Sequence, residues 1–206
     1  MLGTVEVRWF HPGACPAAAH EWFEQLCGGV AEEARVAHYL RIEDVAHLGV
    51  KVRGGQKLEL KHLRADLGPL ELAAGVRGRA GWWRKWSFAL ADPDAGHAEL
   101  RSTPGEWVLI SKRRWSHAFA LSPGGAVVPI DPATTDDHCS VEQVELDMAG
   151  RHWWSVALEA SGHADDLRPL FSAVAAHVFA GWPDGIGLTE HNSWSYPQWL
   201  RATLLE

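Results

Sequence analysis

The chain has 206 residues and a mass of 22.7 kDa, and its 47% hydrophobic and 22% charged residues are typical of a globular protein. Its formal net charge of −7 disfavours nucleic acid and anionic membranes as partners, because both attract basic surfaces. No apolar run approaches the ~18 residues of a membrane-spanning helix, and the first residues lack the apolar segment of a signal peptide. Three cysteines without metal-ligand spacing indicate reduced thiols, so we expect a cytoplasmic location.

Short segments in which apolar and polar residues alternate dominate the chain and predict β-strands. The strands are expected at residues 4–10, 36–40, 48–53, 57–62, 83–91, 107–115, 141–148 and 153–160. Gly54-Gly55 and Ala149-Gly150 predict hairpin turns. Residues 122–138, rich in Pro, Gly, Asp and Thr, predict a loop.

Helical patterns occur near both ends of the chain. A helix over 16–26 begins with Pro16, and apolar residues at helical spacing predict another over 165–180. Ser195 is expected to cap a short final helix. Together these elements predict an α+β fold, an antiparallel and about eight-stranded barrel-like sheet with flanking and C-terminal helices. We expect a single domain over 1–206, with the barrel in 1–162 and a helical segment in 163–206.

Charged residues stand two positions apart on several of these strands, on the side opposite the apolar residues. Side chains alternate across a strand, so each such pair lies on one face of the sheet. The basic residues that this pattern places on the charged face are Arg8, Lys51, Arg53, Lys61, Lys85, Lys112 and Arg114. The acidic residues on the same face are Glu6, Glu59 and Glu159.

The charged face has two interpretations. If the sheet closes, the charges meet in a strongly positive interior, which requires a polyanion or ordered water because unpaired buried cations are costly. Carboxylates among the cations would suit a divalent ion, Mg²⁺ or Mn²⁺, that bridges phosphate oxygens. If the sheet stays open, the same residues form weak ion pairs in water. The alternation alone does not decide between these arrangements.

The register of the strand over 141–148 is also open. Either Glu142 faces inward, or Glu145 and Asp147 do, because a shift of one residue moves every side chain to the other face. These three acids are reserve candidates for metal ligands.

The chain contains twelve tryptophans but only two tyrosines, and most of the tryptophans are expected to fill the core. Only the segment with Trp82, Trp83 and Trp86 interleaves aromatic with basic residues, as surfaces that bind RNA or a protein partner do. The acidic balance of the chain disfavours that use.

The order of the charged segments resembles the CYTH, or triphosphate tunnel, superfamily, in a divergent bacterial branch. The segments are Thr-Val-Glu-Val-Arg at 4–8, Gly-Val-Lys-Val-Arg at 49–53, Lys-Leu-Glu-Leu-Lys at 57–61, Ser-Lys-Arg-Arg at 111–114, Val-Glu-Leu-Asp at 144–147 and Ala-Leu-Glu at 157–159. The resemblance covers about residues 4–160. It implies an antiparallel barrel whose charged interior binds triphosphate groups with a divalent metal, and members include cyclases and triphosphatases.

The chain departs from the pattern of this superfamily mainly at acidic positions. Thr4 stands in place of the first Glu of the first strand, Lys85 and Ser87 in place of an acidic pair, and Ala157 in place of an acid on the last strand. Arg8 replaces a lysine. The basic half of the site is therefore better kept than the acidic half. We expect binding of a triphosphate-bearing small molecule (inorganic triphosphate, a nucleoside triphosphate or thiamine triphosphate), with metal-dependent hydrolysis as its enzymatic form. The alternative is a non-catalytic phosphate-binding or protein-interaction module without the metal.

Overall fold

The computed structural model describes the chain except for residues 1–2, 28–31, 92–106, 136, 164–166 and 205–206. The described strands are β1 (Gly3–Pro12), β2 (Arg35–Leu40), β3 (Leu48–Arg53), β4 (Lys57–Ala73), β5 (Val76–Ala89), β6 (Trp107–Leu121), β7 (Val127–Ile130), β8 (His138–Met148) and β9 (Arg151–Gly162). The helices are α1 (Ala17–Cys27), α3 (Arg168–Phe179) and α4 (Tyr196–Leu204), with short 3₁₀ turns at Pro132–Thr134 and Glu190–Asn192. None of the described helices is long and apolar enough to cross a membrane.

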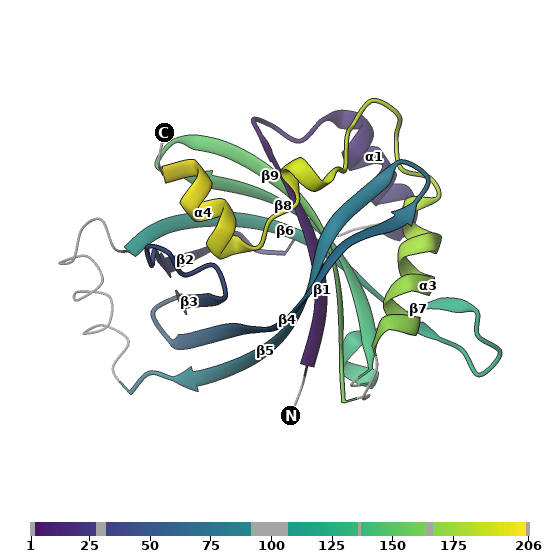
Figure 1. The fold of residues 1–206 in the computed structure, drawn as a ribbon, viewed down its shortest axis with the longest axis horizontal. Coiled ribbons are helices and arrows are strands. Elements are labelled where there is room, and N and C mark those ends of the chain that lie inside the picture. Colours follow the sequence, from purple (N-terminus) through teal and green to yellow (C-terminus); the bar gives the residue numbers. More distant parts are fainter. Residues whose placement is uncertain (1–2, 28–31, 92–106, 136, 164–166, 205–206) are drawn as a thin grey trace.

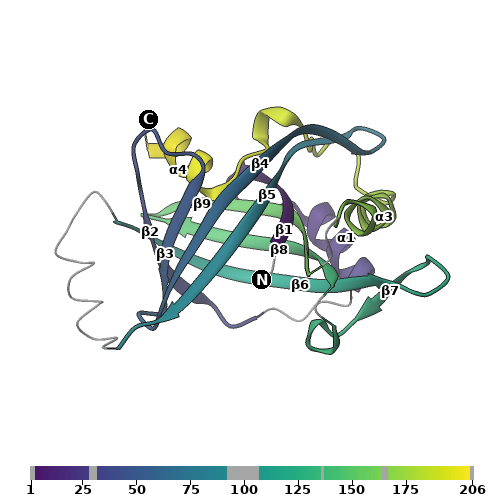
Figure 2. The same cartoon turned by 60° about the horizontal axis from the view of Figure 1, so that its bottom comes forward.

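Eight of these strands form a closed antiparallel barrel. Hydrogen bonding runs in the order β2-β3-β4-β5-β1-β9-β8-β6, and a further pairing between β2 and β6 closes the ring. Strand β7 pairs with the far end of β6 outside the ring. Figures 1 and 2 show the curved wall, with β2 to β5 on one side and β6, β8 and β9 on the other. The predicted α+β class and the barrel of about eight strands are therefore confirmed.

The hairpin of β4 and β5 is much longer than the alternation predicts. The expected strands over 57–62 and 83–91 are the barrel ends of strands that continue to Ala73 and back from Val76. Three register shifts interrupt the extension, one of them between Asp66 and Gly68, and such bulges break the regular alternation that identifies a strand. The expected loop over 122–138 likewise contains strand β7.

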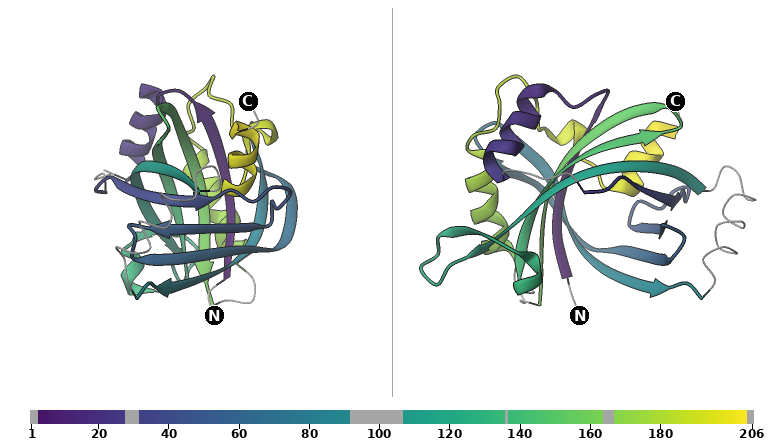
Figure 3. Two further views of the ribbon diagram at one scale, coloured as in Figure 1. Left: turned by 90° about the vertical axis from the view of Figure 1, so that its left-hand side faces the viewer. Right: turned by 180° about the vertical axis from the view of Figure 1, so that it is seen from behind.

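The main hydrophobic core lies outside the barrel, between its wall and two helices. The outer faces of β1, β8 and β9 pack against α1, α3 and the extended hairpin, as the view from behind in Figure 3 shows. The hairpin approaches β1 closely at Gly78, where an added Cβ would lie 2.5 Å from Val7 Cγ2 and 2.7 Å from Trp9 Cζ2. Trp9 Nε1 also donates to the Arg77 carbonyl at 2.8 Å. A side chain at position 78 would push the hairpin off the barrel.

A second core closes one end of the barrel interior. Along β1, Glu6 and Arg8 are followed on the inner face by Phe10, which stacks on Trp199 of α4 at 4.6 Å between ring centres. The residues of this inner core are Phe10, Ala37, Tyr39, Ile110, Val144, Leu146, Met148, Trp199 and Leu200. Because these residues are all buried, the interior is apolar at the α4 end and charged beyond it.

Candidate functional site

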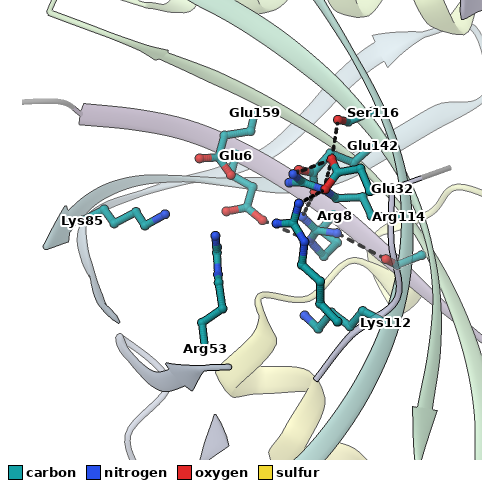
Figure 4. Close-up of polar contacts among 12 residues, drawn as sticks. Glu6, Arg8, Glu32, Arg53, Lys85, Lys112, Arg114, Ser116, Glu142 and Glu159 are labelled. Atoms are coloured by element: carbon teal, nitrogen blue, oxygen red, sulfur yellow. Dashed lines mark hydrogen bonds and ion pairs between the residues drawn. The ribbon is translucent and has the colours of Figure 1, made fainter. Parts of the chain in front are cut away.

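A cavity of about 410 Å³ occupies the charged part of the barrel interior. This volume lies within the range of about 300–1,000 Å³ that small-molecule sites have. The basic side chains that line it are Arg8, Arg35, Lys51, Arg53, Lys61, Lys85, Lys112 and Arg114. The acidic ones are Glu6, Glu32, Glu33, Glu59, Glu142 and Glu159. Figure 4 shows that Arg53 and Lys85 point into the same space as Glu6 and Arg8. Basic groups outnumber carboxylates, so the cavity favours anions.

Glu142 holds two arginines on the wall formed by β1, β6 and β8. Arg8 Nη2 donates to Glu142 Oε2 at 2.8 Å, and Arg114 Nη1 donates to Glu142 Oε1 at 2.7 Å. Burial opposes ionisation of this carboxyl group, but the two guanidinium groups outweigh it and lower the pKa of Glu142 to about 2. Arg114 also binds Glu32 at the cavity rim, with Nε 2.8 Å from Oε1. Fixed charge-assisted bonds of this kind hold both arginines in defined positions.

Glu59 contacts three basic side chains, two from β3 and one from β5. Its carboxylate oxygens lie 3.0 Å from Lys51 Nζ, 3.2 Å from Arg53 Nη2 and 3.5 Å from Lys85 Nζ. Burial raises the pKa of Glu59, but Lys51 and Lys85 outweigh this effect and lower it to about 2. Burial lowers the pKa of Lys51 and of Lys85 against the attraction of Glu59. The single carboxylate of Glu59 therefore only partly neutralises the three cations of Lys51, Arg53 and Lys85.

Glu6 and Glu159 stand directly opposite each other on the paired strands β1 and β9. Lys61 reaches both from β4: its Nζ forms an ion pair with Glu6 Oε2 and lies 3.1 Å from Glu159 Oε2. Glu6 Oε1 also accepts a bond of 3.1 Å from Arg8 Nε. Burial raises the pKa of Glu6, but Lys61 and Arg8 outweigh this effect and lower it to about 2.

Lys112 lies at the inner end of the cavity among aromatic rings. Its Nζ is 3.6 Å from the centre of the Tyr196 ring and 4.5 Å from that of Tyr39, whose hydroxyl accepts a hydrogen bond from it. Within the described part of the chain no carboxylate forms an ion pair with Lys112. Burial and the charges of Lys51 and Arg8 lower its pKa well below the ordinary value. An anion that reached this end would relieve that repulsion.

The structure brings together every basic residue that the alternation assigned to the charged face, together with Glu6, Glu59 and Glu159. The register of β8 places Glu142 in the cavity, whereas Glu145 is exposed on the other face and Asp147 contacts His152 there at 3.2 Å. Glu145 and Asp147 therefore do not line the cavity.

Sequence reasoning missed the aromatic end and part of the rim. The site residues that it did not identify are Glu32, Glu33, Arg35, Tyr39 and Tyr196. The tryptophan segment of β5 does not form one surface either. Trp83 lines the cavity, and Trp82 packs against the outer core.

The acidic groups in this arrangement do not fit a divalent ion. In the described part of the chain no three His, Cys, Asp or Glu side chains stand close enough to hold one. Each of four glutamates in the cavity forms ion pairs with lysine or arginine, and Glu59 does so with three such residues. These glutamates are Glu6, Glu59, Glu142 and Glu159. A metal site needs several oxygen ligands that are free to turn toward the ion. The carboxylates of this cavity do not meet that requirement for Mg²⁺ or Mn²⁺.

Comparisons with known proteins show the fold alone. No protein-family model and no curated protein matches the sequence. Among solved structures, the PH1819 protein of Pyrococcus horikoshii is similar over 97% of this chain and 99% of that one, with 10% identity and a TM-score of 0.51. The PH1012 protein of the same organism has 13% identity and a TM-score of 0.49, covering 92% of this chain and 93% of that one. The conserved hypothetical protein Pfu-838710-001 of Pyrococcus furiosus has 12% identity and a TM-score of 0.46, covering 92% and 94%.

Proposed function

We propose that the barrel binds a triphosphate-bearing small molecule in its charged cavity. The observation that supports this most directly is the excess of basic groups over carboxylates around one cavity. Three cations share Glu59, and Lys112 has no acidic partner in the described part of the chain. Phosphate oxygens accept charge-assisted hydrogen bonds from such groups, and arginine matches their geometry in particular.

The distribution of cations along the cavity favours several linked phosphates over one. Arg53 and Lys85 lie toward the open side, with side chains 37% and 41% exposed, whereas Arg8 is 4% exposed. Lys112 lies at the aromatic end. Because the cations extend from the open side to the aromatic end, a linear chain of phosphates would contact more of them than a single phosphate would. The resemblance of the strand segments to the triphosphate tunnel superfamily supports the same ligand class.

Calorimetric titration with tripolyphosphate, and the thermal midpoint with and without it, test this proposal. A ligand that binds only the folded chain raises the midpoint by mass action. Arg53→Gln is expected to weaken binding by about tenfold, which is the usual worth of one charge-assisted bond. The matched control is Arg77→Gln on the extended hairpin, where a 62% exposed arginine pairs with Glu71 outside the cavity. Absence of binding by the unaltered chain, or equal weakening by both variants, would refute the proposal.

Binding and turnover are separable, because hydrolysis also requires a positioned water and stabilisation of the transferred phosphoryl group. The cationic groups favour binding, and the engaged carboxylates favour the non-catalytic form of the proposal. Phosphate release from tripolyphosphate, nucleoside triphosphates and thiamine triphosphate, measured with and without Mg²⁺ or Mn²⁺, distinguishes the two. Metal-dependent release would establish the enzymatic form.

A further inference from the structure

Two opposed carboxylates on neighbouring strands require a cation between them. Glu6 and Glu159 face each other across the β1–β9 pairing, and both point into the cavity. Two ionised carboxylates in one site repel each other, so a positive group between them stabilises both. A bridging divalent ion is one solution and a lysine is another.

In this chain the cation between Glu6 and Glu159 is the side chain of Lys61. Its ammonium nitrogen forms an ion pair with Glu6 Oε2 and lies 3.1 Å from Glu159 Oε2, so that one cation bridges the two acids. The Trp83 ring, with its centre 5.9 Å from Nζ, lies beside it. Despite burial, the charges of Glu159 and Glu6 raise the pKa of Lys61, so the group stays ionised over the physiological range. A metal ion cannot share the space with this ammonium.

The other inner acids offer no alternative place for a metal. Glu59 is shared by three basic groups, and both oxygens of Glu142 accept bonds from arginines. The positive charge that faces an incoming phosphate is thus supplied entirely by side chains. From this arrangement we infer that Lys61 takes the place of a divalent cation between Glu6 and Glu159, and that the chain binds polyphosphate without metal. This inference rests on the proposed function.

Tripolyphosphate titration of metal-free protein tests the inference directly. The protein and buffers are passed over a chelating resin, and binding is measured by calorimetry with and without added Mg²⁺. We expect the Kd in the metal-free titration to be equal to or lower than the Kd with Mg²⁺, because Mg²⁺ also masks the charge of free tripolyphosphate. Binding that is more than about tenfold weaker without Mg²⁺ would overturn the inference and leave the proposed function standing. Absence of binding under both conditions would overturn both.

A second experiment asks whether the two carboxylates form a cation site once the lysine is removed. Binding of Mn²⁺ to the protein alone is followed by loss of the electron paramagnetic resonance signal of the free ion. We expect no loss with the unaltered chain and a stoichiometric loss with Lys61→Gln. The matched control is Lys57→Gln, which removes the same charge from the same strand at an exposed position outside the cavity lining.

Two results of the manganese experiment would overturn the inference: stoichiometric Mn²⁺ binding by the unaltered chain, or none by a folded Lys61→Gln variant. If Lys61→Gln shows no cooperative thermal transition, the unaltered chain decides the question through its Mn²⁺ binding and its metal-free titration. Both of those measurements use the protein as it stands.

Discussion

Replacing Glu59 with glutamine is expected to strengthen polyphosphate binding. Glu59 is the shared internal anion of Lys51, Arg53 and Lys85, and a phosphate that contacts these groups must compete with it. Glu59→Gln keeps the shape of the side chain and removes its charge. If Glu59 were instead a metal ligand, the same change would weaken binding. The sign of the effect therefore separates the two roles.

The size of the effect follows from Coulomb's law. A phosphate oxygen that contacts these cations lies ~5 Å from the Glu59 carboxylate, and two unit charges at that distance repel by about 3 kcal/mol at an effective dielectric constant of ~20. Arg53 and Lys85 are 37% and 41% exposed, so water and salt reduce this value by about half. About 1.5 kcal/mol remains, which lowers the Kd by about tenfold.

Calorimetric titration with tripolyphosphate at low and moderate ionic strength measures the effect. Glu71→Gln is the matched control, because it makes the same change on the same strand in an exposed ion pair with Arg77, outside the cavity. Without ligand, Glu59→Gln should melt at a lower temperature, since three cations lose their common partner. An unchanged or higher Kd for Glu59→Gln would refute the assignment of Glu59 as an internal anion.

Three further predictions concern protonation and packing. The pKa of Glu142 is lowered from 4.5 to about 2, so its contribution to stability is present above pH ~4.5 and is lost as the pH falls toward 2. Glu142→Gln should therefore make the thermal midpoint, measured by circular dichroism, fall less steeply with decreasing pH. An unchanged dependence on acid pH would contradict this. Tripolyphosphate binding at alkaline pH should take up protons, because the pKa of Lys112 is well below its ordinary value and a bound anion raises that pKa. Calorimetry in buffers of different ionisation enthalpy should show this proton uptake. Lys112→Arg should remove the uptake, because arginine stays protonated. Trp199→Ala should lower the free energy of unfolding in urea by about 3–5 kcal/mol, because Trp199 is fully buried against Phe10. The control Phe88→Ala, at a 51% exposed position, should change the free energy of unfolding by less than about 0.5 kcal/mol.

The inward set of cations could be predicted from the sequence because strand alternation is strictly periodic. Lys51 and Arg53 alternate with Val50 and Val52, so their face follows from parity alone. Strand β8 gives no such signal. It is buried on both faces, with Val141 in the outer core and Val144 in the inner one, so parity does not distinguish Glu142 from Glu145.

The aromatic end of the cavity could not be predicted, because it depends on a long-range contact. Tyr196 belongs to a segment that follows the last strand, and nothing in its local pattern indicates that α4 folds back onto the end of the barrel. Tyr39 lies on a predicted strand, but its part in the site arises only when Tyr196 stacks on it, with 5.1 Å between ring centres. The extension of β4 escaped prediction because bulges and Gly68-Pro69 interrupt its alternation.

The apolar core beneath α4 turns the barrel into a cup with a closed base. A linear polyphosphate that entered it would do so end-first, passing Arg53 and Lys85 before its terminal phosphate met Arg8 and Lys112. The remainder of a longer polymer would project into solvent, and departure would retrace the same path. A cavity with one closed end would bind the terminal phosphate of a linear polyphosphate and would exclude an internal segment or a cyclic polyphosphate. This selectivity would not depend on the group that the other end of the polyphosphate bears.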